Sequence, residues 1–188
     1  MNKDLLIQII YQGIGIIALT ISAISFQCKS LKKLLILQCA ASVLWCTHFA
    51  IGGAFAACLM NGLCIIRSIA YAFIKDKKWR WTFTSLICVM FIGTGVISVI
   101  CLNELWYIAT ITAVASVVGN IFFSIGNSLL YKYVQLGFIS PCWLFNNINC
   151  KSIGGIICES FNMISIIVFI VKMLIQNKNS KKQNNETI

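Results

Sequence analysis

The fold is decided by one stretch, LQCAASVLWCTHFAIGGAFAACLMNGLCIIRSI (residues 37–69), in which two apolar segments flank a small-residue turn. Trp45 lies in the segment before the turn, and Asn61 lies in the segment after it. At a helical rise of about 1.5 Å per residue, both side chains are predicted about 9 to 10 Å below the same boundary. The stretch therefore predicts two neighbouring helices with a tryptophan and an asparagine at one depth.

The same pattern occurs a second time in the chain. An offset of 98 residues places Trp45 on Trp143, and three further residues in the turn place Asn61 on Asn162. Duplicated membrane bundles with a site at the repeat interface are a common design of small transporters. The recurrence predicts a duplicated three-helix unit with a shared polar pocket.

The composition indicates that lipid is the solvent. Hydrophobic residues make up 59% of the chain and charged residues 11%, against about 25% charged in a typical soluble domain. The ten cysteines are scattered through apolar segments and there is one histidine, so we expect small hydrophobic side chains and no metal or cofactor. We expect the bilayer as partner, with a homo-oligomer left open.

Seven apolar spans are predicted, each near the length of about 20 residues that crosses a bilayer. Their approximate bounds are 5–26, 31–51, 54–74, 81–102, 105–126, 129–149 and 153–175. An odd fourth span keeps both units in the same orientation, which is a parallel repeat. The predicted fold is all-α, in a 3+1+3 arrangement with repeats at 1–76 and 105–176, a linker helix at 77–104 and a disordered tail at 177–188.

The net charge of +10 is interpreted as a topology signal, with no nucleic acid implied. Threading the chain through seven spans puts twelve of the fifteen Lys and Arg residues on one face. Cytoplasmic loops carry the excess of Lys and Arg. The amino terminus is therefore predicted outside and the carboxyl terminus in the cytoplasm.

These features resemble two groups of proteins. The 3+1+3 order with a Trp and an Asn in each repeat is similar to the SWEET sugar transporters and the wider PQ-loop superfamily, although Phe26 stands before Gln27 where that group has proline. Over nearly the whole chain, the run quoted above resembles the YgjV-type bacterial inner-membrane proteins. The resemblance implies a bacterial inner membrane protein whose three-helix bundles rock against each other.

The paired Trp45, Asn61, Trp143 and Asn162 are the first candidates for substrate binding. An amide offers donor and acceptor, and an indole offers a flat apolar face with one donor, which suits a small polar solute. The alternative is that each asparagine bonds a neighbouring helix, a contact worth about 0.6 kcal/mol on average. We favour the pocket because the asparagine occurs in both repeats.

Arg67 and Glu159 are the most costly residues of the spans. A charge within the apolar zone costs about 2.5 to 3.5 kcal/mol even on insertion scales, so each should have a partner or line a wet cavity. Their predicted depths differ too much for a direct pair. We expect Arg67 to line the pathway or to snorkel, and Glu159 to act as a protonatable site or as a neutral acid bonded to a neighbouring helix.

Three further polar residues extend the candidate site. His48 lies one turn beyond Trp45, where it would gate the outer mouth or form an interfacial hydrogen bond. Asn146 occupies the matching place in the second unit, and Asn120 matches Ser22 at the same offset. Pro141 is expected to kink the sixth span beside the pocket.

The favoured function is transport of a small polar solute by alternating access. The alternative is a non-transporting receptor, sensor or assembly factor that uses the same bundle. An enzyme is not expected, because no nucleophile and base pair, paired carboxylates or metal set stands out.

Overall fold

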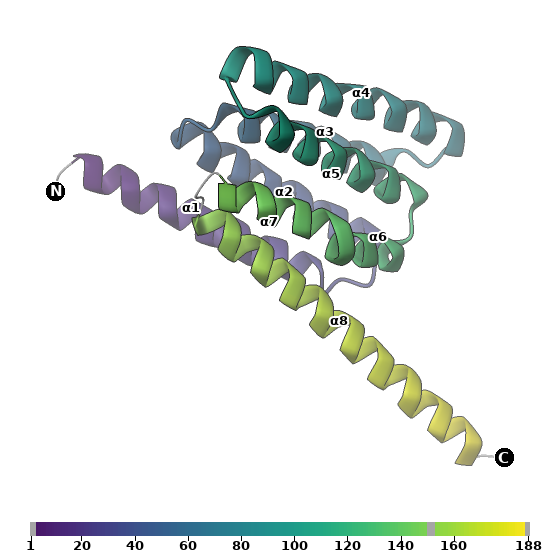
Figure 1. The fold of residues 1–188 in the computed structure, drawn as a ribbon. Coiled ribbons are helices and arrows are strands. Elements are labelled where there is room, and N and C mark those ends of the chain that lie inside the picture. Colours follow the sequence, from purple (N-terminus) through teal and green to yellow (C-terminus); the bar gives the residue numbers. More distant parts are fainter. Residues whose placement is uncertain (1–2, 150–152, 187–188) are drawn as a thin grey trace.

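The computed structural model describes residues 3–149 and 153–186, and every regular element in these ranges is helical (Figure 1). The elements are α1 (Lys3–Ser25), α2 (Leu31–Ile51), α3 (Phe55–Phe73), α4 (Lys77–Leu102), α5 (Trp106–Ile125), α6 (Ser128–Val134), η1 (Gln135–Ile139), α7 (Ser140–Asn149) and α8 (Ile153–Glu186). The all-α prediction is confirmed. The division of the chain into repeats stays a prediction.

Capping residues explain several helix ends. Asp76 accepts a hydrogen bond from the Trp79 backbone N–H at 2.9 Å, so α4 begins four residues before the predicted span. Gly126 ends α5 with a φ of 84°, a left-handed conformation that glycine adopts without a Cβ penalty. The side chain of Asn127 then accepts from two backbone N–H groups at the start of α6.

The predicted span 129–149 is a composite helix, made of α6, η1 and α7 in succession. Its middle turn is π-helical, and the Ser140 backbone N–H donates to the Gln135 carbonyl. Pro141 follows at once and has no N–H to offer the regular ladder. A π-helical turn beside a proline is a local departure from the regular helix, and the kink expected at Pro141 stays a prediction.

Six helical segments surround a common centre. In order around this ring, α1 packs on α2, α2 on α3, α3 on α5, α5 on α7, α7 on α8 and α8 on α1. Helix α4 packs on α3 and α5 and lies at the edge of the bundle (Figure 1). Two three-helix units joined head to tail through a peripheral linker helix would give this order.

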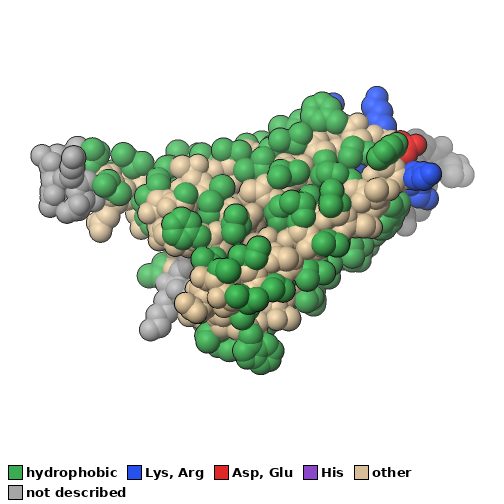
Figure 2. Space-filling view, turned by 90° about the horizontal axis from the view of Figure 1, so that it is seen from above, with side chains coloured by type: hydrophobic (Ala, Val, Ile, Leu, Met, Phe, Trp, Pro, Cys, Tyr) green, Lys and Arg blue, Asp and Glu red, His purple; other side chains and the backbone are tan. Residues whose placement is uncertain are grey.

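The outer surface is apolar, and the charges lie at one end. Within the described ranges, six helices are long and apolar enough to cross a membrane, and the composite helix is the seventh segment. Lys and Arg side chains gather at one end of the molecule (Figure 2). We call it the basic end, which carries the turns 26–30, 74–76 and 126–127; the turns 52–54 and 103–105 lie at the opposite end.

The largest buried cluster lies toward the basic end. It includes Phe26, Leu34, Phe123 and Tyr131, each no more than 4% exposed. A second cluster joins α3, α4 and α5, and a third joins α1, α2 and α8. The ring is therefore filled with side chains toward one end and less filled toward the other.

Helix α8 is longer than predicted. It continues to Glu186, whereas the composition predicts a disordered tail over residues 177–188. Extending a helix that already exists adds one hydrogen bond per ordered residue without a new nucleation cost. The polar tail therefore continues the helix beyond the apolar span.

Candidate functional site

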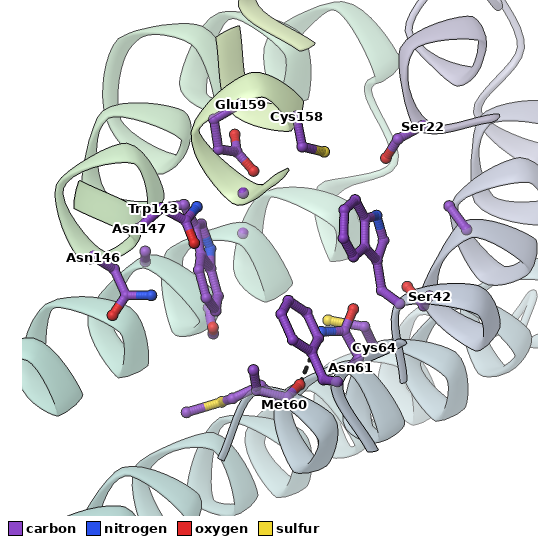
Figure 3. A pocket seen from close by; sticks show the side chains of 18 of the residues that line it. Ser22, Ser42, Met60, Asn61, Cys64, Trp143, Asn146, Asn147, Cys158 and Glu159 are labelled. Atoms are coloured by element: carbon purple, nitrogen blue, oxygen red, sulfur yellow. Dashed lines mark hydrogen bonds between the residues drawn. The ribbon is translucent and has the colours of Figure 1, made fainter. Parts of the chain in front are cut away.

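The ring encloses a cavity of about 750 Å³. Its lining residues come from α1, α2, α3, α5, the composite helix and α8, while α4 contributes only Leu102 at its end. Figure 3 shows Ser22 and Ser42 on one side and Trp143 and Asn146 across from them, with Cys158 and Glu159 of α8 between the two sides. A cavity of this size fits a small organic molecule.

All four members of the paired motif line this cavity: Trp45, Asn61, Trp143 and Asn162. The Asn61 amide donates to the Ala57 carbonyl of its own helix at 2.8 Å. The Asn162 amide donates to Cys158 Sγ, also on its own helix, at 3.6 Å. Neither amide donates to a neighbouring helix in these contacts, so the alternative of interhelical bonding is not what the structure shows. A role in binding stays a prediction.

Arg67 lies deep in the cavity wall and is 6% exposed. Its Cζ atom lies 4.6 Å from the centre of the Phe123 ring, and its Nη1 atom lies 3.8 Å from where a Cβ on Gly119 would be. The Nε atom is buried and has no hydrogen-bond partner. The guanidinium therefore packs on an aromatic face while one of its donors is unused.

Glu159 lines the cavity from α8. The Ser140 hydroxyl and the Asn162 amide approach its carboxyl group, but its Oε2 atom is buried without a partner. Among the described residues, neither Glu159 nor Arg67 has an ion-pair partner, which agrees with the predicted difference in depth. The Oδ1 atom of Asn162 is also buried without a partner.

The cavity reaches the turns of the opposite end, and toward the basic end it reaches the buried ring of Phe26. Its lining includes Gly53, Ala54 and Glu104 from the opposite end, but no residue from the turns 74–76 and 126–127. Toward the basic end, the rings of Phe123 and Tyr131 stack at 3.7 Å. The Tyr131 hydroxyl donates to Gln135 Oε1 at 2.7 Å. The cavity is thus accessible from one side, and packed aromatic side chains form its floor.

Two predicted site residues lie outside the cavity lining. His48 stacks on the Tyr11 ring with centroids 3.9 Å apart, and its Nδ1 atom lies 3.0 Å from the Tyr11 carbonyl oxygen. It fills the space between α1 and α2, which corrects its placement in the pocket and supports the interfacial alternative. Asn146, its counterpart, does line the cavity.

Asn120 is the second correction. It is fully buried, accepts a hydrogen bond from Tyr71 at 2.8 Å and donates to the Thr84 carbonyl at 3.0 Å. Its side chain faces α3 and α4, because residue 120 lies on the side of α5 that contacts the linker helix. Ser22, its predicted equivalent, lines the cavity.

Sequence reasoning missed the contacts that join the two units at the basic end. Lys132 is one of the twelve Lys and Arg residues that the topology prediction places on one face, yet it is fully buried. Its Nζ atom lies 2.6 Å from the Cys28 carbonyl oxygen and 3.1 Å from the centre of the Phe169 ring. Gln27 donates to Ser165 Oγ at 2.7 Å. The only available signal was the position of Lys132 inside the predicted span 129–149.

The described residues contain no group of three His, Cys, Asp or Glu side chains arranged to hold a metal ion. Cys46 and Cys58 approach each other, with sulfur atoms 3.3 Å apart, and both are free thiols. The polar groups of the cavity itself are amides, hydroxyls, indole N–H groups, thiols, one guanidinium and two carboxyl groups. This set is suited to binding an organic solute by hydrogen bonds.

These features define a helical membrane protein with a central cavity that reaches one end of the bundle. The chain belongs to the Imp-YgjV family of bacterial inner membrane proteins, whose family model matches residues 9–177. No curated protein and no solved structure is significantly similar to the chain.

Proposed function

We propose that the protein carries a small polar solute across the bacterial inner membrane by alternating access. The observation that supports this is the cavity of about 750 Å³, which is lined by all six segments of the ring. A cavity that is open at one end and closed by side-chain packing at the other has the geometry of one access state. Transporters with parallel repeats carry their sites at the repeat interface.

In the proposed transport cycle, the closed end of the cavity opens and the open end closes. The floor would open by parting the first three helices from the composite helix and α8, and the cavity mouth would close. The polar contacts that would break include the Gln27 hydrogen bond to Ser165 and the Lys132 hydrogen bond to the Cys28 carbonyl. Water can replace such polar contacts when this end opens.

The proposed orientation follows the Lys and Arg distribution. With the basic end in the cytoplasm, the cavity faces outside. Reporter fusions at each terminus would test the orientation, with activity expected from a cytoplasmic reporter at the carboxyl terminus alone.

The experiment has two stages. Purified protein is first screened by thermal shift against sugars, nucleosides, amino acids and small carboxylates, because a ligand that binds only the native state raises the melting temperature. The stabilising solute is then followed in counterflow into proteoliposomes. Asn162→Ala is expected to abolish both signals.

The matched control is Asn149→Ala. Asn149 is exposed on α7, and its amide donates to the Phe145 carbonyl of its own helix. This variant should bind and transport like the wild type. Binding without counterflow would contradict transport and favour the receptor or sensor.

A further inference from the structure

We propose that the solute is a small zwitterion whose anionic group binds Arg67 and whose ammonium group binds Glu159. This inference rests on the proposed function and specifies the substrate class of the same cavity. It starts from the buried polar atoms that have no partner.

Six such side-chain atoms occur among the described residues, and three of them belong to the cavity lining. These three are Arg67 Nε, Glu159 Oε2 and Asn162 Oδ1. A buried polar group without a partner costs free energy that a suitably placed ligand recovers. These three atoms belong to side chains of the cavity wall, and a ligand that reaches them would supply the missing partners.

The unpartnered acceptors and the unpartnered donor lie on different helices of the cavity wall. The unused acceptors, Glu159 Oε2 and Asn162 Oδ1, are three residues apart on α8 and so lie on one face of that helix. The unused donor, Arg67 Nε, lies across the cavity on α3. An ammonium group offers three donors and no acceptor, whereas a carboxylate offers acceptors alone. One molecule that carries both groups matches both walls.

The charges point to the same class of ligand. Arg67 is 6% exposed and lies beside the Phe123 ring, without a carboxylate partner among the described residues. A simple anion would pair with Arg67 and leave Glu159 uncompensated, and a simple cation would do the reverse. A zwitterion neutralises both, which matters because an unpaired charge in a low-dielectric site is costly.

The cavity also supplies an aromatic surface on the side of Glu159. Trp143 and Glu159 lie toward the same side of the pocket (Figure 3). Indole rings attract cations through their faces and pack well on short apolar chains. We therefore place the ammonium group near Trp143 and Glu159, with the anionic group deeper, at Arg67.

The test compares probes of one skeleton at constant ionic strength and neutral pH. The probes are 4-aminobutyrate, butyrate and n-butylamine, with glycine and 6-aminohexanoate added to vary the distance between charges. Their dissociation constants for the full-length protein are measured by thermal shift. Since a charge-assisted hydrogen bond is worth about tenfold or more in affinity, the best zwitterion should bind at least about tenfold tighter than either singly charged probe.

Two variants assign the ends of the ligand. Glu159→Gln should remove the preference of the zwitterion over butyrate, and Arg67→Gln should remove its preference over n-butylamine. Asn149→Ala should keep the wild-type ranking. If a variant fails to fold, the wild-type ranking still decides.

Three outcomes would overturn the inference: equal binding of the zwitterion and a singly charged probe, stabilisation by none of these probes, or a preference that survives both variants. A neutral sugar or nucleoside that binds and exchanges in counterflow would also refute it, while leaving the proposed transport intact. Failure of counterflow with a bound zwitterion would refute transport and retain the site.

Discussion

Gly155 shows how a single missing side chain positions part of the cavity wall. A Cβ atom built on Gly155 would overlap the side-chain amide of Asn147, which is 8% exposed and lines the cavity. The adjacent Gly154 would meet nothing within 4 Å. Two neighbouring glycines of one helix therefore differ sharply in what they permit.

We expect Gly155→Ala to destabilise the protein by about 1 to 3 kcal/mol, the usual cost of overpacking a buried contact. The displaced Asn147 should also weaken solute binding. Thermal unfolding and the thermal-shift affinity measure the two effects, with Gly154→Ala as the matched control. A melting temperature of Gly155→Ala equal to that of the control would contradict the packing argument.

Glu104 provides a pH-dependent test at the cavity mouth. It lies between α4 and α5, outside the membrane-spanning segments, and burial raises the pKa of its carboxyl group above the ordinary value of 4.5, although a hydrogen bond with Ser98 opposes this shift. A raised pKa in the folded state means that the charged form is disfavoured there. The destabilisation is absent below pH 4.5 and grows as the pH rises through the folded-state pKa.

Glu104→Gln should therefore be more stable than the wild type at pH 7.5, and the difference should close as the pH is lowered toward 4.5. Melting temperatures of both proteins across this range give the answer. A difference that is constant with pH would show that the Glu104 charge is not destabilising in the folded state.

At the scale of helices, the polar contacts of Asn120 attach the peripheral α4 to the ring. The side chain joins Tyr71 of α3 and Thr84 of α4 to α5, and the Tyr71 hydroxyl also contacts the Thr84 hydroxyl at 2.8 Å. All three residues are nearly or fully buried. In a buried network, losing one member leaves the others with unsatisfied groups.

Asn120→Ala should lower stability by about 1 to 3 kcal/mol, the cost of leaving buried polar groups unpaired. Solute affinity should change little, since Asn120 does not line the cavity. Thermal unfolding and thermal-shift titration separate the two. A large loss of affinity without a loss of stability would instead restore Asn120 to the binding site.

The composite helix shows how far sequence reasoning reaches at this scale. Pro141 predicts a kink beside Trp143, and the structure has a π-helical turn directly before Ser140 and Pro141. The π-helical turn, which brings Gln135 and Ile139 into the cavity lining, was not predicted. Proline marks a lost hydrogen bond in the sequence, but neighbouring helices determine how the ladder is repaired.

For the whole molecule, the closed floor depends on contacts between segments far apart in the chain. Gln27 bonds Ser165, and Lys132 bonds the Cys28 carbonyl beneath the Phe123 and Tyr131 rings. These polar contacts add to the packing of the largest buried cluster. In the proposed transport cycle, these are the contacts that would break when this end opens.

A Gln27→Leu, Lys132→Met variant should populate the state that is open at the basic end, because it keeps volume and removes both polar contacts. Hydrogen exchange of residues 22–30 and 162–170 should rise several-fold relative to the wild type. Lys33→Ala, an exposed lysine at the same end, is the control. Unchanged exchange would show that apolar packing alone keeps this end closed.

The sequence by itself determined the membrane class, the spans, the turns and the residues of the paired motif. These features depend on local composition and spacing. A span is recognised by the length of its apolar segment, and a turn by its characteristic residues. Only the tertiary structure decided which polar residues share the cavity. Asn162 faces the cavity and Asn120 does not, because the neighbours of each helix determine which of its sides is interior. A nearly uniform apolar exterior leaves no periodic pattern in the sequence that would predict this side.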